Sequence, residues 1–464
     1  MANLILGPIL RRVVGDEAVL WLRTDGPATV RVSAGTVETT APTFEVEGVH
    51  LALPILTGLP DGATEYRVYL DDRLVWPPKD QPPSVITTQS GETTMIAFGS
   101  CRDLMQRSDP DALELYAHNA MKSGDLPRLL ALIGDQIYAD QVWQFDEYVD
   151  LYQQAWSVPT VRWLLSTVPT IMIFDDHEIH DDWNSSASWV ADMAAHPRWD
   201  EHMRAALLSY WLFQHLGNLP PARVRTADPL TPPKKWNFTV DVGRIRLIML
   251  DCRGSRVLDG TRRRMFPQAQ WDDLARDSQA DCDHLVIACS LPWLLAPAIH
   301  HGESLMEVLS HRFGGWMEKL RRRYDIEHWA AVGDSFGELT GIITAARRPA
   351  TVTVLGGDIH NSYVAQAFLP DRPRVLQVVC SPLNNELDST TRTLLKLGWS
   401  RLISGPAALV ARLAGVPQPA VRWKALTKPI FTNAIGTLTF TGDDLVTELH
   451  ISGGSGRMAS AARI

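Results

Sequence analysis

The first 90 residues alternate apolar and polar side chains over short stretches, such as "ATVRVSAG", "TFEVEGVH" and "EYRVYLDD". Turn residues separate these stretches, and the dipeptide Asp-Gly occurs at 25–26 and again at 61–62. Alternation with a period of two gives a strand one buried and one exposed face, and regularly spaced turns join such strands into antiparallel sheets. The pattern therefore predicts a small antiparallel β-sandwich domain over residues 1–90.

The pattern changes after the proline-rich stretch "WPPKDQPPSV" at 76–85, which is typical of a stiff linker. Beyond it the apolar runs no longer alternate, as in "RLLALIGDQ", "IRLIMLDCRG" and "TVTVLGGDIH". Continuous apolar runs are typical of strands buried on both faces, and helical stretches such as "DALELYAHNAM" lie between several of them. We expect an α/β domain over residues 91–464, in which layered β-sheets are flanked by helices.

Two segments of this second domain have patterns of their own. Residues 184–235 are rich in tryptophan and in helix-forming residues, as in "SYWLFQHLGNL", and predict a helical insert over the functional site. Residues 434–452, "AIGTLTFTGDDLVTELHIS", predict a closing β-hairpin that turns at a Gly-Asp pair.

Composition narrows the class of protein. The formal net charge of −9 at pH 7 argues against nucleic acid or an anionic membrane surface as the main partner. The five cysteines include no CxxC pair, and an odd number does not indicate a disulfide framework. The N-terminus lacks the order of charged and apolar residues found in a secretory signal, and no run approaches the roughly 18 apolar residues of a membrane span. We expect a cytoplasmic protein without a membrane span.

Four of the predicted buried strands end in side chains that can bind metals. The four endings are "AFGSCRD", "IGDQIYAD", "FDDHEIHDDW" and "LGGDIHNSY". A single acid at one strand end is usually a helix cap or a loop ion pair, but four such endings on four strands point to a shared site, because ligands collect at the carboxyl ends of strands in α/β sheets. So many carboxylates near one another repel, and the nearby arginines are too few to offset them. The sequence therefore predicts a pair of metal ions bridged by a carboxylate.

The order of these motifs resembles that of the dinuclear metallophosphoesterases, which include the purple acid phosphatases. In that superfamily the motifs run GDxxY, GNHE and GHxH, and the counterparts here are "GDQIY" (134–138), "DDHE" (175–178) and "GDIH" (357–360). With "FGSC" at 98–101 and a β-sandwich in front, the chain is most similar to the PhoD-like alkaline phosphatase family. The resemblance implies a metallophosphoesterase-type arrangement of layered sheets and a small-molecule phosphoester as substrate.

The resemblance also implies one set of metal ligands. Asp135 matches the bridging carboxylate, Cys101 and Tyr138 complete the set around one metal, and His360 is a further ligand. Cys101 has the alternative of being a small buried residue, and Tyr138 that of packing only. The spacing of three residues between Asp135 and Tyr138 lets both side chains turn to one point.

The second half of the site is assigned by the same resemblance. Asp176 stands where related enzymes place an amide ligand of the second metal, and Asp358 stands where they place a histidine. His177 matches the residue that acts as acid or hydrogen-bond donor toward the leaving group. The chain departs from related enzymes on the strand "LVIACSLPW", which offers Cys289 and Ser290 where a further histidine is usual. The second metal is then either weakly bound or held by one of the acids in "HDDW" at 180–183.

Three residues near these motifs have more than one interpretation. Arg102 is expected to contact the substrate phosphate, although arginines at strand ends as often pair with a local carboxylate, and Arg253 has the same two alternatives. His180 lies three residues after His177 and would share its face in a helical turn, supporting the metal ligands from behind.

The ligand types also bear on the metals. Thiolate and phenolate suit a ferric ion, whereas a site of carboxylates alone favours calcium, magnesium or manganese. A pair of Fe(3+) and Ca(2+) follows, which is also what the PhoD resemblance implies, with Mg or Mn as the alternative second ion.

The predicted activity is hydrolysis of phosphate monoesters or diesters by a water or oxide bound to the metals. Two alternatives stay open. One is a phosphodiesterase, phospholipase or nuclease with the same site, although the net charge does not suggest the basic groove of a nuclease. The other is a metal-binding interaction protein without turnover.

Overall fold

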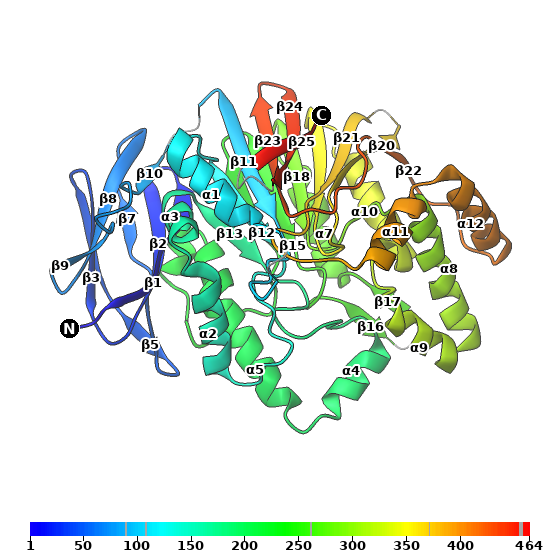
Figure 1. The fold of residues 1–464 in the computed structure, drawn as a ribbon, viewed down its shortest axis with the longest axis horizontal. Coiled ribbons are helices and arrows are strands. Elements are labelled where there is room, and N and C mark those ends of the chain that lie inside the picture. Colours follow the sequence, from blue (N-terminus) through cyan, green and yellow to red (C-terminus); the bar gives the residue numbers. More distant parts are fainter. Residues whose placement is uncertain (89–90, 107–108, 260–261, 371, 454–457) are drawn as a thin grey trace.

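The computed structural model describes residues 1–88, 91–106, 109–259, 262–370, 372–453 and 458–464 (Figure 1). Ten strands form two sheets at the N-terminal end of the chain. The first sheet has the order β1-β2-β6-β5, with β7 beside β2, and the second has the order β10-β8-β3-β4, with β9 beside β8. The strands are β1 (Leu4–Val14), β2 (Glu17–Thr24), β3 (Thr29–Ala34), β4 (Val37–Pro42), β5 (Phe44–Val46), β6 (Val49–Ala52), β7 (Ile55–Thr57), β8 (Ala63–Leu70), β9 (Arg73–Trp76) and β10 (Val85–Thr87).

Alternation in the sequence explains how these sheets face each other. In β3 the buried residues are Val30, Val32 and Ala34, and the residues between them are half-buried. These side chains pack in one core with Leu20 and Leu22 of β2, so the two sheets form an antiparallel sandwich.

Two larger sheets form the centre of the molecule. A six-stranded sheet has the order β13-β12-β11-β23-β24-β25, and a seven-stranded sheet has the order β14-β15-β18-β19-β21-β20-β22. The first contains β11 (Thr93–Gly99), β12 (Leu129–Ile133), β13 (Thr170–Ile173), β23 (Ala434–Thr441), β24 (Asp444–Ser452) and β25 (Met458–Arg463). The second contains β14 (Phe238–Val242), β15 (Ile245–Leu250), β18 (His284–Cys289), β19 (Thr351–Gly356), β20 (Tyr363–Leu369), β21 (Arg372–Val379) and β22 (Arg422–Ala425). A short ribbon pairs β16 (Val257–Asp259) with β17 (Arg262–Arg264).

Helices cover the outer faces of both sheets (Figure 1). The helices of the described residues, some of which lie farther from the sheets, are α1 (Ala112–Ser123), α2 (Phe145–Trp156), α3 (Pro159–Thr167), α4 (Ala187–Ala194), α5 (Trp199–Tyr210), α6 (Pro221–Val224), α7 (Gln268–Asp277), α8 (Pro297–Phe313), α9 (Gly315–Arg323), α10 (Gly333–Ala345), α11 (Ser389–Gly398) and α12 (Arg401–Leu413). A π-helical turn at Trp211–His215 and 3₁₀ turns at Leu216–Asn218 and Trp329–Ala331 complete the set. No helix in the described part of the chain has both the length and the apolarity to cross a membrane.

The core between the two large sheets explains the continuous apolar runs. Phe98 and Ala131 of the six-stranded sheet pack against Leu247, Val286 and Val378 of the seven-stranded sheet. The opposite faces of the same strands contact helices, so these strands are buried on both sides. The mixed α/β architecture predicted from the sequence is confirmed, and β23 and β24 form the predicted C-terminal hairpin.

The helical insert lies in a place that the sequence did not predict. Trp21 of β2 donates a hydrogen bond from Nε1 to the carbonyl of Leu212 over 2.8 Å, and the buried guanidinium of Arg11 binds the carbonyl of Gln214 at 2.6 Å. The π-helical turn of the insert is thus joined to the N-terminal sheets. The insert ties the two parts of the chain together, and its Asn184 and Gln214 also donate hydrogen bonds to Arg253 and Glu178 near the site described below.

Candidate active site

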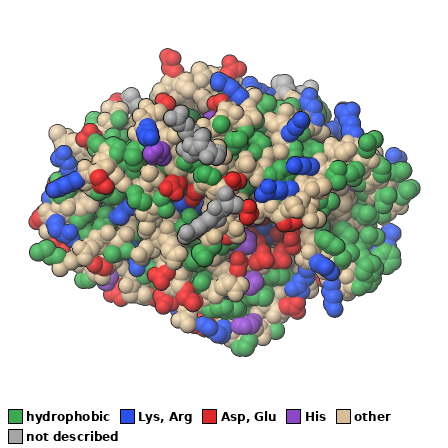
Figure 2. Space-filling view, viewed as in Figure 1, with side chains coloured by type: hydrophobic (Ala, Val, Ile, Leu, Met, Phe, Trp, Pro, Cys, Tyr) green, Lys and Arg blue, Asp and Glu red, His purple; other side chains and the backbone are tan. Residues whose placement is uncertain are grey.

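Seven parallel strands end at the same place in the molecule. The parallel pairs are β11 with β12 and β12 with β13 in one sheet, and β15 with β18, β18 with β19 and β19 with β21 in the other. The residues that follow these strands meet across the two sheets and include Cys101, Asp135, Asp176, His177, Arg253, Ser290, Asp358, His360 and Asn385. Several of them lie in a pocket of about 670 Å³, and Figure 2 shows acidic side chains gathered near the centre of this face.

The backbone is strained at four of the predicted metal-ligand positions. Cys101, Asp135, Asp358 and His360 have φ angles of 59°, 59°, 62° and 48°. The left-handed region is uncommon for residues with a side chain and costs free energy, so the surrounding structure must hold these residues in place. Such strain is concentrated at functional sites, and here it turns the side chains back over the strand ends.

Two glycines of the motifs allow the sheets to approach each other. A Cβ atom on Gly134 would lie 3.1 Å from the Cβ of Ser290, which follows a strand of the other sheet. One on Gly357 would lie 2.2 Å from the Oγ of Ser100, again across the two sheets. Gly134 also has a φ of 121°, which disfavours any other residue there. The glycines of "GDQIY" and "GDIH" are therefore required by the packing around the site.

One half of the site contains a thiol, a carboxylate, a phenol and an imidazole. The Sγ of Cys101 lies 3.3 Å from Oδ2 of Asp135, and the Oη of Tyr138 lies 3.4 Å from Nε2 of His360. Asn385 donates from Nδ2 to the Oη of Tyr138 over 2.7 Å and so fixes the direction of the phenol. The structure thus brings together the four residues expected around the first metal.

The chemistry of this half fits a bound cation. Burial raises the pKa of Cys101 well above its usual value, and nearby Asp135 raises it further. Burial and the charge of Asp175 likewise raise the pKa of Asp135, and burial raises that of Tyr138. Oδ1 of Asp135 is buried without a hydrogen-bond partner among the described residues. A cation would bind this free oxygen and stabilise the three ionised forms.

His360 is already in the state that binds metals. Burial lowers its pKa to about 4, so the imidazole is neutral at pH 7. Neutral imidazole has a free nitrogen lone pair, which is the ligand form of histidine.

His177 is held by two neighbours. Its Nδ1 lies 2.9 Å from both carboxylate oxygens of Asp140, and its ring stacks on Tyr138 with 4.2 Å between the ring centroids. Burial by itself would lower the pKa of His177, but Asp176, Asp140 and Asp135 more than reverse this and raise it well above its usual value. Since Asp140 binds Nδ1, Nε2 is the nitrogen that remains for a ligand in the pocket.

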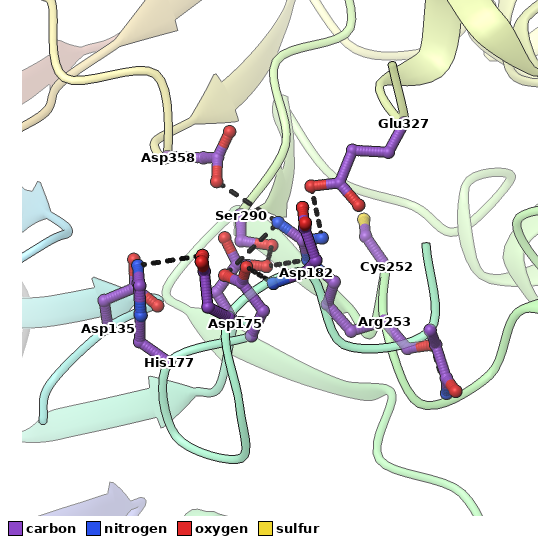
Figure 3. A network of polar contacts seen from close by, with 12 residues as sticks. Asp135, Asp175, His177, Asp182, Cys252, Arg253, Ser290, Glu327 and Asp358 are labelled. Carbon is purple, nitrogen blue, oxygen red and sulfur yellow. Dashed lines mark hydrogen bonds and ion pairs between the residues drawn. The ribbon is translucent and has the colours of Figure 1, made fainter. Parts of the chain in front are cut away.

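The other half of the site is organised around one arginine (Figure 3). The side chain of Arg253 is fully buried, and its Nε lies 2.5 Å from Asp175 and its Nη2 lies 3.3 Å from Asp176. Nη2 is also 3.2 Å from Asp358, and Nη1 is 2.5 Å from Glu327. Burial alone would lower the pKa of Arg253, but these carboxylates raise it, so the guanidinium is a fixed positive charge in the acidic cluster.

Asp358 has a second cationic partner. Nε2 of His328 lies 3.0 Å from Asp358, and Nδ1 of the same ring lies 2.8 Å from Glu303. Burial would raise the pKa of Asp358, but the hydrogen bond from His328 and the charge of Arg253 lower it. Asp358 is therefore an ionised carboxylate whose charge is already offset by two side chains.

Two groups of side chains have the spacing of a metal site. Ligand atoms of Asp135, Asp176 and His177 lie within 4.8 Å of one another, and so do those of Asp175, Asp176 and Asp358. Arg253 binds all three residues of the second group but only Asp176 of the first. The two halves of the predicted pair of metal sites therefore differ in how much negative charge is left for an ion.

Glu178 stabilises the backbone of two loops at the site. Its carboxylate is buried and accepts hydrogen bonds from the backbone nitrogens of Asp135 (3.3 Å), Gln136 (2.6 Å) and Asp175 (2.9 Å). Burial raises its pKa to about 7. The glutamate of "DDHE" thus fixes the loops that follow two strands, which explains its place beside the predicted ligands.

Arg102, the predicted substrate contact, lies outside the pocket. The guanidinium of Arg102 is buried, with Nε 2.7 Å from Asp111 and Nη1 on the carbonyl of Ala155. These contacts leave it without access to the pocket, so the structure argues against the predicted contact with substrate phosphate.

The residues that line the pocket do not include any from the insert at 184–235.

His180 points away from the predicted metal ligands. Its ring packs edge-on against Trp189 and Trp199, and its Nδ1 lies 3.0 Å from the carbonyl of Asp181. The turn that starts at Asp176 therefore separates His180 from His177, and His180 anchors the insert.

Sequence reasoning assigned no role to three residues that contact the predicted ones, although Asp140 lies in the quoted ending "IGDQIYAD". They are Asp140, which binds His177, His328, which binds Asp358, and Asn385, which binds Tyr138. Asn385 follows the apolar run "VLQVVCSPLNN", so the rule that located the other strand ends could have found it. His328 follows no such run, and only the tertiary structure places it in the pocket.

Comparisons with known proteins identify the family of the chain. Residues 97–398 match the PhoD-like phosphatase family, and residues 1–88 match a domain of unknown function, DUF7800. The chain belongs to the PhoD-like phosphatase family. It is a phosphoester hydrolase of the metal-dependent kind, as the sequence predicted.

Solved structures agree with this assignment at the level of the fold. A structure of PhoD superposes with a TM-score of 0.69 at 13% identity, over 99% of this chain and 90% of that one. The purple acid phosphatase PPD1 from yellow lupin (Lupinus luteus) seeds superposes with a TM-score of 0.60 at 11% identity, over 98% of this chain and 73% of that one. No curated protein sequence matches the chain.

Proposed function

We propose that this PhoD-like phosphatase hydrolyses phosphate monoesters or diesters in the pocket above Asp135. The observation that carries the proposal is the meeting of Cys101, Asp135, Tyr138 and His360 beside His177, with a buried oxygen of Asp135 left free. Metal ions bound there would polarise the phosphoryl oxygens and supply a water of lowered pKa. The four residues would hold the first ion.

The residues of the chain supply the remaining steps. The raised pKa of His177 favours the protonated ring, and its Nε2 donates a proton to the oxygen of the leaving group. Asp140 orients the ring through Nδ1 and stabilises the imidazolium. Burial of the acidic cluster strengthens these interactions, because a low local dielectric weakens the screening of charge.

For the metals, we propose iron at Cys101, Asp135, Tyr138 and His360, and calcium beside Asp176. Thiolate and phenolate ligands suit Fe(3+), and the carboxylates near Asp176 suit Ca(2+), with Mg or Mn as alternatives. Arg253 already offsets Asp175, Asp176 and Asp358, so the second ion binds more weakly than the first.

Hydrolysis of para-nitrophenyl phosphate and of its bis-ester tests the function and separates the alternatives. Purified protein should hydrolyse at least one of them, and a chelator or the substitution Asp135→Asn should lower kcat by at least about 100-fold. The ratio of the two rates distinguishes a monoesterase from a diesterase. Failure to hydrolyse either ester in the presence of iron and calcium would support a metal-binding protein without turnover.

Elemental analysis and a visible absorption spectrum test the metal assignment. Phenolate or thiolate on ferric iron absorbs visible light, so the protein should be coloured, and Tyr138→Phe and Cys101→Ser should each shift or weaken the band. An active, colourless preparation without iron would contradict the assignment of these two residues while leaving the hydrolase in place.

A further inference from the structure

The segment that follows β21, the last of the parallel strands that end at the site, has an unusual charge. Residues 389–428 contain no Asp or Glu, although the whole chain has a formal net charge of −9. Their basic residues are Arg392, Lys396, Arg401, Arg412, Arg422, Lys424 and Lys428. None of the seven takes part in the ion pairs found among the described residues. The net charge of the chain thus conceals a local basic region that includes α11 and α12.

The same two helices expose a large apolar surface. In α12, Leu402, Pro406, Leu409 and Leu413 follow one another at helical spacing, and all four are exposed. The leucines at 402 and 413 are 87% and 80% exposed, whereas Ala411 on another face of α12 is buried. The helix therefore has a solvent-facing apolar stripe in addition to the face that packs on α8.

α11 extends this surface. Leu394 and Leu397 are 62% and 47% exposed and lie three residues apart, so they share one side of the helix. Figure 2 shows hydrophobic side chains with Lys and Arg among them at the right, where Figure 1 labels α12. We call the pair α11 and α12, residues 389–413, the apolar hairpin.

The apolar hairpin also forms a wall of the active-site pocket. The lining of the pocket includes Leu395 and Ile403 from the hairpin and Ile299 and Met306 from α8, in addition to the acidic residues around Asp135. One end of the pocket is thus charged and the other end is apolar and leads toward the exposed stripe. A substrate with a phosphate group and a long apolar part matches both ends.

We propose that the apolar hairpin docks on an anionic lipid surface and that the pocket draws an amphiphilic phosphoester from it. Exposed leucines insert between acyl chains, and the basic residues around them attract anionic headgroups, a combination that holds amphipathic helices at a membrane surface. The substrate part of this proposal rests on the proposed hydrolase function, whereas the docking part does not.

Charge argues for a lipid surface over a second copy of the chain. A dimer formed through this face would bring two segments with seven Lys or Arg each, and no acid, against each other. Like charges across an interface are unfavourable, so self-association through the hairpin is opposed by the same residues that favour anionic lipid.

Vesicle sedimentation with the full-length protein tests the docking. Vesicles of phosphatidylcholine with about 30% phosphatidylglycerol should bind the protein, and vesicles of phosphatidylcholine alone should bind it less. The double variant Leu402→Gln/Leu413→Gln should lower binding to the anionic vesicles by at least about tenfold, because two leucines no longer insert. The matched control Leu74→Gln/Leu230→Gln changes two exposed leucines elsewhere and should bind as the wild type does.

A second variant and a soluble substrate complete the design. Arg401→Gln/Arg412→Gln should lower binding to anionic vesicles and make it less sensitive to salt. Leu402 and Leu413 do not line the pocket, so the leucine variant should hydrolyse a soluble ester at the wild-type rate while losing activity on a phosphodiester embedded in the vesicles.

Several results would overturn the proposal. Absence of binding to both kinds of vesicle, or equal binding by the leucine variant and its control, would show that the hairpin is not a lipid-docking surface. A dimer that becomes monomeric in the leucine variant, without vesicle binding, would assign the face to a second copy. Vesicle binding without hydrolysis of any ester would retain the docking and reject the hydrolase.

Discussion

Arg253 and Asp358 come from strand ends 105 residues apart in the sequence and form an ion pair of 3.2 Å inside the acidic cluster. The arginine has no solvent exposure, and the same guanidinium binds Asp175, Asp176 and Glu327. A buried charge is tolerated only when it is paired, so the carboxylates and the arginine depend on one another. Part of the positive charge that the acidic strand ends require is therefore built into the chain.

Loss of this arginine should destabilise the fold. We expect Arg253→Met to lower the free energy of unfolding by about 3–5 kcal/mol, because it leaves buried carboxylates without their partner. Calcium at millimolar concentration should restore part of the loss by taking the place of the guanidinium. Urea unfolding with and without calcium measures both effects.

The matched control is the exposed pair of Arg246 and Asp241, 2.8 Å apart. Arg246→Met should cost at most about 1 kcal/mol, because water screens an exposed pair. Equal losses from the two substitutions would contradict the central role of Arg253.

The contact between Asp140 and His177 should matter for turnover and not for substrate binding. Asp140→Asn keeps the size of the side chain but removes the charge that holds and stabilises the imidazolium. We expect kcat on para-nitrophenyl phosphate to fall by about 10- to 100-fold with little change in KM. Asp181→Asn, which alters a carboxylate 3.9 Å from Nε2 of His177 and 65% exposed, should have a smaller effect. A change in KM alone would assign Asp140 to the substrate site.

Arg102 should behave as a structural residue. It forms a buried pair with Asp111, and Asp111 also accepts a hydrogen bond from the backbone of Glu114 at the start of α1. Arg102→Met should lower the free energy of unfolding by about 3 kcal/mol and leave KM unchanged in the folded fraction. A higher KM with unchanged stability would restore the predicted contact with substrate.

The buried histidine His215 should make the protein sensitive to acid. Burial, together with the nearby charge of Arg11, lowers its pKa to about 3. Between about pH 6.5 and pH 3 the unfolded chain binds a proton at this residue that the folded chain does not. The contribution of neutral His215 to the free energy of unfolding is therefore fully present above about pH 6.5 and is lost as the pH falls toward 3.

Urea unfolding at several pH values measures this effect. One proton of difference corresponds to about 1.4 kcal/mol per pH unit, so His215→Gln should flatten the loss of stability between pH 5.5 and 4 by about that slope. His300, whose pKa burial also lowers to about 3, offers a second variant with the same expected sign. An unchanged slope in both variants would contradict this account.

The sequence by itself determined the strands and pointed to the residues of the predicted metal site. Alternation defined the N-terminal sandwich, continuous apolar runs defined the strands of the two large sheets, and the polar residues that end those runs pointed to Cys101, Asp135, Tyr138 and His360. These features are local, because a side chain at a strand end is fixed by the few residues before it. The family followed from the order of the same short motifs.

Only the tertiary structure decided which side chains offset the acids and what encloses the pocket. Arg102 and Arg253 both follow buried strands, yet Arg102 meets Asp111 beneath α1 and Arg253 meets four carboxylates in the site. The walls of the pocket come from α8 and the apolar hairpin, and not from the insert, which is bound to the N-terminal sheets. Long-range packing of helices and loops sets these contacts, and no pattern within a short stretch of sequence records it.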